Sequence, residues 1–223
     1  VFTVENTFLD NQLDREEYNE NIEFLTSLTN VIYTSEVIIH NMKDNEAIKK
    51  HAALFKVMTD TTSMFLDSVL PFIHTPYTYD FDNALGKQNW TNMLVSKLLK
   101  TKKGNCHSLP YLYKIISDEL DIPCYLSFAP THIYIKLFAE STGWYNTDLT
   151  SATFPVDAWI IASGYVSVDA IRNGLYMDTL STRQSVAHCL VDLAHGYQRK
   201  YGRDDAGFVI KCCNTALAYH PTN

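Results

Sequence analysis

The spacing of apolar residues predicts helices over the first third of the chain. Between residues 12 and 72, apolar positions recur at intervals of three and four, as they do along one face of a helix. One such pattern runs over Ala47–Leu70, and Pro71 and Pro76 are expected to end it. A polar, aromatic loop is expected to follow over residues 77–87.

Further along, the helical period persists to Leu120 and then changes to two. A short helix is predicted over Trp90–Leu99, and a longer one begins near residues 106–109, because Pro110 is tolerated only in a first turn. Beyond this helix, apolar and polar residues alternate as they do in half-buried strands. Three strands are predicted: Cys124–Phe128, His132–Phe138 and Trp144–Leu149. Helices followed by a strand meander predict the α+β class.

The last part of the chain is expected to be irregular over residues 151–180 and helical afterwards. Two helices are predicted, Gln184–Tyr201 and Asp205–Tyr219, on either side of Gly202. Their apolar face is expected to contain Val186, Leu190, Leu193, Val209 and Leu217. We therefore expect three parts: an N-terminal helical region (1–84), a central core (85–180) and a helical tail (181–223).

The end of the helical tail resembles the end of a tetratricopeptide repeat unit. Ala194, Tyr197 and Ala206 keep one repeat register, whereas Ala216 and Pro221 fall three residues late. Two helices cannot bury both of their faces, so further repeats or a partner protein are expected to cover one of them. We expect the first helix to dock on the core and the second to keep an exposed outer face. The exposure of three side chains tests this: Phe208, Cys212 and Leu217.

Composition and charge narrow the function classes. With 25 acidic and 18 basic residues, the net charge is −7 and no basic stripe is present, which argues against nucleic acid as a partner. The apolar runs are far shorter than 18 residues, so no membrane span is expected. The chain starts at Val1 without a charged and apolar leader, so any signal peptide is expected to have been removed or left out of this sequence. Abundant Tyr, Asn and Thr favour the periplasm or cell surface over the cytoplasm.

The five cysteines are an odd number without framework spacing, which favours a free thiol over a disulfide scaffold. Four of them fall on predicted strands or helix faces and are expected to be ordinary buried residues: Cys124, Cys189, Cys212 and Cys213. A metal site could combine the last two with His188 or His220. Since no paired C-x-x-C spacing supports it, we expect no metal and no cofactor.

The fifth cysteine, Cys106, lies in the segment Lys103-Gly104-Asn105-Cys106-His107-Ser108, at or just before a predicted helix start. Unpaired N–H groups and the helix dipole favour a thiolate there and can also stabilise an oxyanion. Gly104 is expected to allow close approach of a substrate or a positive φ. The capping residue stays open among Asn105, His107 and Ser108.

A base and an acid follow Cys106 on successive strands. His132 opens one strand and can act as general base and then as general acid, and Asp148 closes the next strand and can orient the imidazole. Taken singly, His132 would be a strand histidine and Asp148 a turn residue; together with Cys106 they predict a triad. His107 is an alternative base, but its side chain is expected to point elsewhere because it neighbours the cysteine.

These residues resemble the transglutaminase-like superfamily, which shares a papain-like core. The resemblance covers residues 85–160 and rests on Gly104-x-Cys106, the strand-borne His132 and Trp144-x-x-x-Asp148-x-Thr150. The segments Gly104–Leu109 and Ala129–His132 also resemble a bacterial branch in which such a core precedes tetratricopeptide repeats. The resemblance implies a catalytic triad of Cys106, His132 and Asp148.

Members of this superfamily include peptidases, amidases, cross-linking transferases and proteins without known activity. The sequence therefore predicts acyl transfer through a cysteinyl thioester on a peptide or amide substrate, with hydrolysis favoured over cross-linking. The alternative is a non-enzymatic scaffold or binding module that keeps the fold. A side-chain oxyanion donor is expected upstream of the cysteine, with Gln88, Asn89 and Trp90 as candidates. The aromatic cluster Pro76–Phe81 either packs or rims a substrate cleft.

Overall fold

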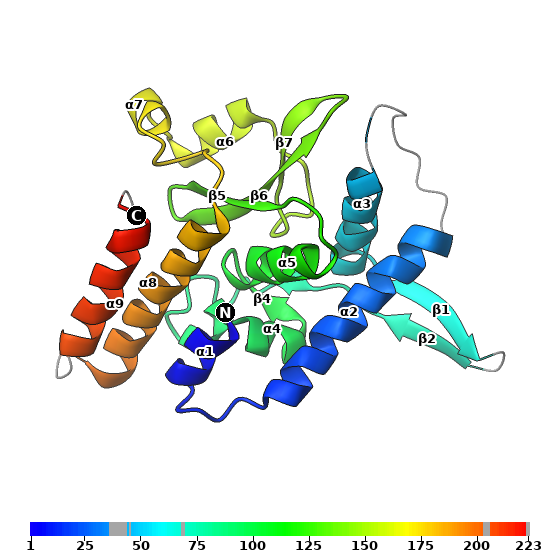
Figure 1. Ribbon diagram of the computed structural model, residues 1–223, viewed down its shortest axis with the longest axis horizontal. Coiled ribbons are helices and arrows are strands. Elements are labelled where there is room, and N and C mark those ends of the chain that lie inside the picture. The colour runs from blue at the N-terminus through cyan, green and yellow to red at the C-terminus, as the bar shows by residue number, and fades with distance from the viewer. Residues whose placement is uncertain (36–43, 45, 68–69, 203–205, 222–223) are drawn as a thin grey trace.

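Helices surround a small three-stranded antiparallel sheet, so the α+β class predicted from the sequence is confirmed (Figure 1). The computed structural model describes residues 1–35, 44, 46–67, 70–202 and 206–221. The described chain begins with three helices: α1 (Phe2–Phe8), α2 (Arg15–Ser35) and α3 (Glu46–Thr59). Helices α2 and α3 confirm the helical period in this region. They pack together through buried residues spaced three and four apart, among them Leu25, Ile32, Leu54 and Met58.

Helix α1 was not expected from the apolar pattern, and a buried carboxylate attaches it to the rest of the protein. Glu5 is 3% exposed, and its two oxygens accept hydrogen bonds from the backbone N–H groups of Val95 and Ser96. These are the first two residues of α4 (Val95–Thr101). The carboxylate therefore satisfies donors that a helix start leaves unpaired.

The predicted helix over Ala47–Leu70 is wrong in its second half. Helix α3 ends at Thr59, and an antiparallel hairpin of β1 (Thr62–Asp67) and β2 (Leu70–His74) follows it. Val69, which the helical pattern included, lies outside the described residues. A short apolar run fits periods of two and 3.6 almost equally well, and β-branched threonines at 59, 61 and 62 disfavour continued helix. Pairing with β2 then decides the conformation.

The central part follows the prediction closely. A 3₁₀ helix η1 (Trp90–Met93) and α4 replace the predicted helix at residues 90–99, and α5 (Ser108–Glu119) begins where Pro110 requires. The sheet has the order β5 (Tyr125–Ala129), β6 (His132–Ala139) and β7 (Gly143–Thr147). The expected loop over residues 77–87 contains a short strand, β3 (Thr78–Tyr79), which pairs in parallel with β4 (Lys103–Gly104).

The sheet is covered on both faces. Helix α5 packs on one face through a core that includes Leu112 and Ile116 of the helix and Ile133 and Ile135 of β6. The other face carries a second cluster of buried side chains: Ala129, Tyr134, Ile160, Val166 and Met177. Both faces of β6 are therefore shielded from water, which holds its first residue in a defined place.

The region 151–180, expected to be irregular, contains two short helices, α6 (Asp157–Gly164) and α7 (Val168–Arg172). Neither helix is long enough to show a periodic apolar pattern. Ile160 of α6 is buried against Tyr134 of the sheet. Packing on the sheet, rather than local periodicity, therefore forms this part of the structure.

The two predicted tail helices are present as α8 (Thr182–Tyr201) and α9 (Ala206–Tyr219), which lie side by side (Figure 1). Ser181 and Gln184 form a capping box at the start of α8. The predicted apolar face is wrong at two positions, because Val186 and Leu217 are 50% and 46% exposed. Smaller residues make up the buried face instead: Ala187, Cys189, Ala194, Cys212 and Ala216. Small side chains let the helices approach closely.

The three side chains chosen to test the tail differ in their exposure to solvent. Cys212 is buried, Phe208 is half-buried and Leu217 is exposed, so α9 keeps an exposed outer face as the sequence predicts. Helix α8 contacts α1 and η1, and a Cβ on Gly196 would approach the Trp90 indole nitrogen to 2.4 Å. The first tail helix is therefore docked on the rest of the chain.

One cluster of buried side chains draws on all three predicted parts of the chain, extending from Tyr18 through Leu112 and Ile135 to Cys189. Within the residues that the structure describes, no helix combines the length and apolar character that crossing a membrane requires.

Candidate active site

Cys106 lies in a turn that directly precedes α5, and Asn105 shapes this turn. The Asn105 side chain is fully buried, and its oxygen accepts hydrogen bonds from the N–H groups of His107 and Ser108. Asn105 thus does the capping, although His107 occupies the position before the helix. Because Asn105 already binds these two N–H groups, they are less available for an oxyanion; the expectation that helix-start N–H groups serve one stays a prediction.

Gly104 is required for a reason other than the two expected. Its backbone is not in the positive-φ region, and a Cβ at this position would meet the Ser108 hydroxyl at 2.3 Å and Leu98 at 2.8 Å. The Ser108 hydroxyl accepts from the Asn105 N–H and donates to the Asn92 carbonyl. Close packing under the turn, rather than substrate approach, therefore explains the glycine.

His132 reaches the cysteine because a two-residue hairpin turn, Pro130-Thr131, places it at the first position of β6. Thr131 has φ +59°, which such a tight turn requires. The Cys106 thiol donates to the Thr131 carbonyl oxygen at 3.9 Å, and His132 is near enough to lower the pKa of the thiol. The thiol is thus held between the start of α5 and the tip of the β5–β6 hairpin.

Asp148 approaches His132 because of the register of the β6–β7 ladder. Ile135 pairs with Thr147, so Asp148, the next residue, extends the ladder opposite Tyr134. His132 is two residues from Tyr134 and points to the same face, which makes it the diagonal neighbour of Asp148. Its Nε2 lies 3.4 Å from Asp148 Oδ2, and Nδ1 is then the nitrogen that can take the thiol proton.

The second oxygen of Asp148 is fixed by its own turn. Oδ1 accepts hydrogen bonds from the N–H group and the hydroxyl of Thr150, at 2.8 and 2.7 Å. Backbone bonds between Asp148 and Thr153 close the loop. The structure therefore brings together all three residues that the sequence identified, and it adds Thr150 as the group that orients the carboxylate.

The electrostatics of the group favour charge separation. Burial raises the pKa of the Cys106 thiol, but the hydrogen bond from His132 and the positive charges of His107 and His132 outweigh it and hold this pKa below its ordinary value. Burial likewise opposes charge on His132, yet the bonds to Asp148 and Cys106 raise its pKa to about 9. The pair therefore favours a thiolate beside an imidazolium.

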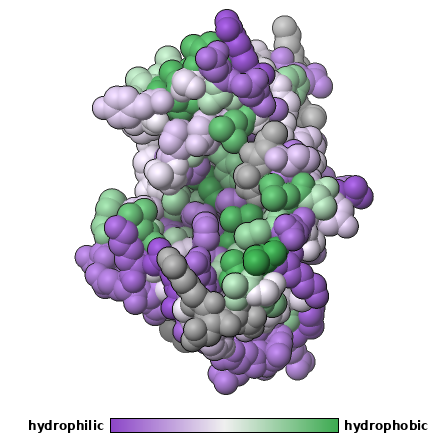
Figure 2. All heavy atoms as spheres, turned by 90° about the vertical axis from the view of Figure 1, so that its left-hand side faces the viewer, coloured by the Kyte–Doolittle hydropathy of each residue, from purple (hydrophilic) through white to green (hydrophobic). Residues whose placement is uncertain are grey.

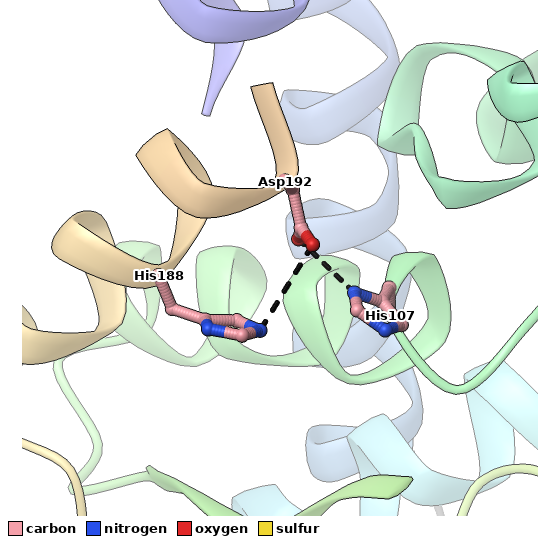
Figure 3. Close-up of side chains that lie close together, drawn as sticks. All are labelled: His107, His188 and Asp192. Atoms are coloured by element: carbon pink, nitrogen blue, oxygen red, sulfur yellow. Dashed lines mark hydrogen bonds and ion pairs between the residues drawn. The ribbon is translucent and has the colours of Figure 1, made fainter. Parts of the chain in front are cut away.

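A second histidine and carboxylate lie behind the cysteine. His107 does not face the thiol; its Nδ1 lies 3.0 Å from Oδ2 of Asp192 on α8. The same oxygen accepts a 2.8 Å hydrogen bond from the Tyr111 hydroxyl, and His188 Nε2 lies 4.0 Å from Oδ1 (Figure 3). Sequence reasoning missed Asp192; its spacing of four from His188 was the available signal, but only the packing of α8 shows what it contacts.

The group His107, His188 and Asp192 is also the place where the described residues could hold a metal ion, with ligand atoms within 4.8 Å of one another. Bonds of about 2.0–2.1 Å to a tetrahedral zinc ion would bring ligand atoms to about 3.4 Å apart. The direct contact of 3.0 Å between His107 and Asp192 is a hydrogen bond. Hydrogen bonding thus accounts for this arrangement.

The three predicted oxyanion donors have partners elsewhere. The Gln88 amide donates to the Asp82 carbonyl, the Asn89 side chain accepts from Thr91, and the Trp90 ring lies under Arg199. A different residue of the region upstream of Cys106 lies near the thiol. Tyr79, half-buried on β3, pairs with Gly104, and burial together with the charges of Cys106 and Asp148 raises its pKa. The aromatic cluster at residues 76–81 was the sequence signal for it.

A cavity of about 280 Å³ opens beside His132 and Asp148; Cys106 does not belong to its lining. His132, Asp148 and Thr150 form one part of its wall. Apolar and small residues from the hairpin turn and α6 form most of the remainder: Pro130, Pro155, Trp159, Ile160 and Gly164. A substrate group that is bound there would lie directly against the His–Asp pair.

No model of a known protein family, no curated protein and no solved structure matches this chain. The functional argument for it therefore depends on the geometry of its own residues.

Proposed function

We propose that this protein is a cysteine-dependent acyl-transfer enzyme with a transglutaminase-like, papain-like core, and that it hydrolyses a peptide or amide bond. The observation that carries the proposal is the approach of Cys106, His132 and Asp148 from three separate elements, in the order that thiol catalysis needs. The 3.4 Å contact between His132 and Asp148 supports it, as does the effect of the nearby His132, which lowers the pKa of the Cys106 thiol.

The reaction follows from these contacts. The Cys106 thiolate attacks the carbonyl carbon of the substrate, and the carbonyl electron pair moves to oxygen. The tetrahedral intermediate collapses as His132 gives its proton to the leaving amine, which leaves an acyl thioester on Cys106. His132 then takes a proton from water, the resulting hydroxide attacks the thioester, and the carboxylic acid departs as the thiolate reforms.

In the turn before α5, Asn105 binds the N–H groups of His107 and Ser108, which favours a side-chain donor for the oxyanion of the intermediate. The Tyr79 hydroxyl is the side-chain donor that we assign to this role. It is close enough for the charges of Cys106 and Asp148 to affect its ionisation. A neutral phenol near a forming oxyanion stabilises the transition state by a short hydrogen bond.

The cavity beside the triad suggests the substrate class. Its wall is predominantly apolar, and Trp159 stands 57% exposed at α6. A peptide or amide with an aliphatic or aromatic group next to the scissile bond would bury that group there. Water can reach an open cavity, whereas cross-linking requires a second site for an amine, so hydrolysis is the favoured outcome.

A scaffold or binding module is the second candidate, and one observation favours it. The outer face of α9 exposes Ile210, Leu217 and Tyr219 by 46–56%. Figure 2, in which the side carrying α9 faces the viewer, shows apolar residues in separate groups with hydrophilic residues between them. A helix of a further repeat or a partner protein could cover α9, and this role is compatible with catalysis by the core.

Thiol labelling followed by a substrate screen tests the proposal. Limiting iodoacetamide should alkylate Cys106 faster than the other four cysteines at pH 6–7, as read by mass spectrometry of peptides. A library of N-acyl peptide amides should then yield hydrolysis that Cys106→Ala removes and Cys213→Ala retains. Alkylation of all five cysteines at one rate, with no hydrolysis of any amide, would favour the scaffold instead.

A further inference from the structure

The side chain that follows the nucleophile in sequence is held by the helical tail. His107 lies in the turn with Cys106, and its ring faces Asp192 on α8 (Figure 3). Its Nδ1 donates to Asp192 Oδ2 at 3.0 Å, and its ring stacks on His188 with centroids 5.8 Å apart. Two residues that are 85 positions apart in sequence thus form a partly buried pair that includes the neighbour of the proposed nucleophile.

The contacts of Asp192 favour an ionised carboxylate although the residue is buried. Its residue is 8% exposed, and one carboxylate oxygen accepts from both His107 and Tyr111. The other oxygen faces His188 at 4.0 Å. A buried carboxylate costs several kcal/mol unless hydrogen bonds and an opposite charge compensate for it. Among the groups around it, His107 is the one in direct contact that can supply the full positive charge.

We propose that Asp192 is a positioning residue: from α8 it keeps a protonated His107 next to Cys106, so that the docked helical tail sets the reactivity of the thiol. The inference rests on the proposed use of Cys106 as a nucleophile. On this inference, the helical tail contributes a residue to the reactive centre and is not merely an appended repeat. Displacing α8 would remove the carboxylate, and His107 would then lose its proton near neutral pH.

The ionisation of the neighbouring groups agrees with this geometry. Burial lowers the pKa of His107, but the Asp192 carboxylate outweighs burial and raises this pKa to about 9. Burial raises the pKa of Asp192, and the charges of His107 and His188 bring it down to about 2. The charge on His107 is in turn one of the causes that lower the pKa of the Cys106 thiol.

Other titratable groups lie near His107 and Asp192 and affect their ionisation. Tyr111 donates to Asp192 from α5, and His132 on β6 opposes a second positive charge on His107. His188 lies on α8, and burial together with the charge of His188 lowers the pKa of His220, which follows α9. His132 thus disfavours positive charge on His107, whereas Asp192, together with the charge of Cys106, favours it.

The experiment measures the rate of Cys106 alkylation by iodoacetamide between pH 4 and 10 in the full chain. Asp192→Asn keeps the size of the side chain but removes its charge. We expect its alkylation midpoint to rise by about one pH unit, with roughly tenfold slower labelling at pH values below the wild-type midpoint. Asp192→Glu restores the charge and should recover most of the labelling rate.

Glu5→Gln is the matched control, because Glu5 is another buried carboxylate that joins a helix to the body of the protein. It should lower the thermal midpoint without moving the alkylation midpoint. If Asp192→Asn behaves like Glu5→Gln, the role of Asp192 is only structural and the inference is overturned. If Asp192→Asn does not fold, NMR titration of the wild-type imidazoles decides: a His107 ring that is already neutral at pH 7 overturns the inference.

The two proposals can fail separately. If the alkylation midpoint rises in Asp192→Asn and the wild-type protein cleaves no amide, the charge coupling is supported and the hydrolase function is rejected. If the midpoint is unchanged in Asp192→Asn and the wild-type protein hydrolyses amides, the hydrolase function is supported and the charge coupling is rejected.

Discussion

Asp148 and His132 are diagonal neighbours across the β6–β7 ladder, with 3.4 Å between Oδ2 of the aspartate and Nε2 of the histidine. A register shift by one residue would turn the carboxylate to the opposite face of the sheet. The pairing of β6 with β7 is therefore as important for the proposed triad as the three side chains themselves.

Asp148→Asn should reduce kcat/KM for amide hydrolysis by about 10²-fold while leaving measurable activity. The nucleophile and the base remain, but the imidazole loses its orientation and the charge that stabilises its protonated form. Steady-state kinetics would measure this. Asp169→Asn, on the exposed surface of α7, is the control and should match the wild type. Equal activity in both variants would remove Asp148 from the mechanism.

Cys106→Ala should abolish hydrolysis and lower the free energy of unfolding by only about 1 kcal/mol, or a few degrees in Tm. The side chain is buried, but one sulfur atom contributes little to packing, and its removal also ends a charge separation that folding must maintain. Calorimetry and a hydrolysis assay together check this. A variant that fails to fold, paired with an inactive wild type, would identify Cys106 as a core residue.

Activity should depend on pH as a bell-shaped curve. The acid limb follows ionisation of the Cys106 thiol: burial raises its pKa, but the contact with His132 and the charges of His107 and His132 together outweigh burial and lower this pKa. The alkaline limb follows loss of the His132 proton, because its bonds to Asp148 and Cys106 raise that pKa to about 9. A pH profile of kcat/KM measures both limbs. Asp148→Asn should move the alkaline limb to lower pH; a profile in which it stays fixed would contradict the assignment.

The pair of His107 and Asp192 should stabilise the fold over a defined pH range. Asp192 has a native pKa of about 2, below its unfolded value near 3.9, so its contribution is present above about pH 4 and is lost as pH falls through 2. His107 has a native pKa of about 9, above its unfolded value near 6.5, so its contribution is full below about pH 6.5 and is lost as pH rises through 9.

Urea unfolding of the wild type and Asp192→Asn at several pH values would measure this stabilisation. The difference should be about 2 kcal/mol between pH 4 and 6.5 and should shrink as pH rises from about 6.5 through 9. A difference that stays constant from pH 5 to pH 10 would mean that the pair is not ionised in the native state.

Tyr79→Phe should lower kcat for hydrolysis by about 10²-fold, as expected for loss of one oxyanion donor. It should leave the pH dependence of Cys106 alkylation nearly unchanged, because alkylation forms no oxyanion. Tyr77→Phe serves as the control, because Tyr77 is a buried tyrosine two residues earlier in the chain. If alkylation and hydrolysis fall together in Tyr79→Phe, the phenol shapes the site instead of stabilising the intermediate.

Local signals in the sequence were sufficient for much of the region around the proposed site. Pro110 restricts where α5 can begin, so Cys106 had to lie at the turn before it. Alternating apolar residues defined β5, β6 and β7, and a short hairpin between the last two made them neighbours. From these facts alone, Cys106, His132 and Asp148 could be placed on adjacent elements.

Tertiary packing decided what these periodic patterns do not encode. The run after Thr59 became a hairpin because β1 found a partner in β2, and α6 formed because Ile160 packs on the sheet. Gly104 is needed because Ser108 and Leu98 fill the space beside it. The contact of His107 with Asp192 joins residues 85 positions apart, and no local propensity predicts which buried groups meet at such a distance. The sequence by itself determined the elements around Cys106, His132 and Asp148, because their patterns are local, whereas only the folded chain determined which charges surround Cys106.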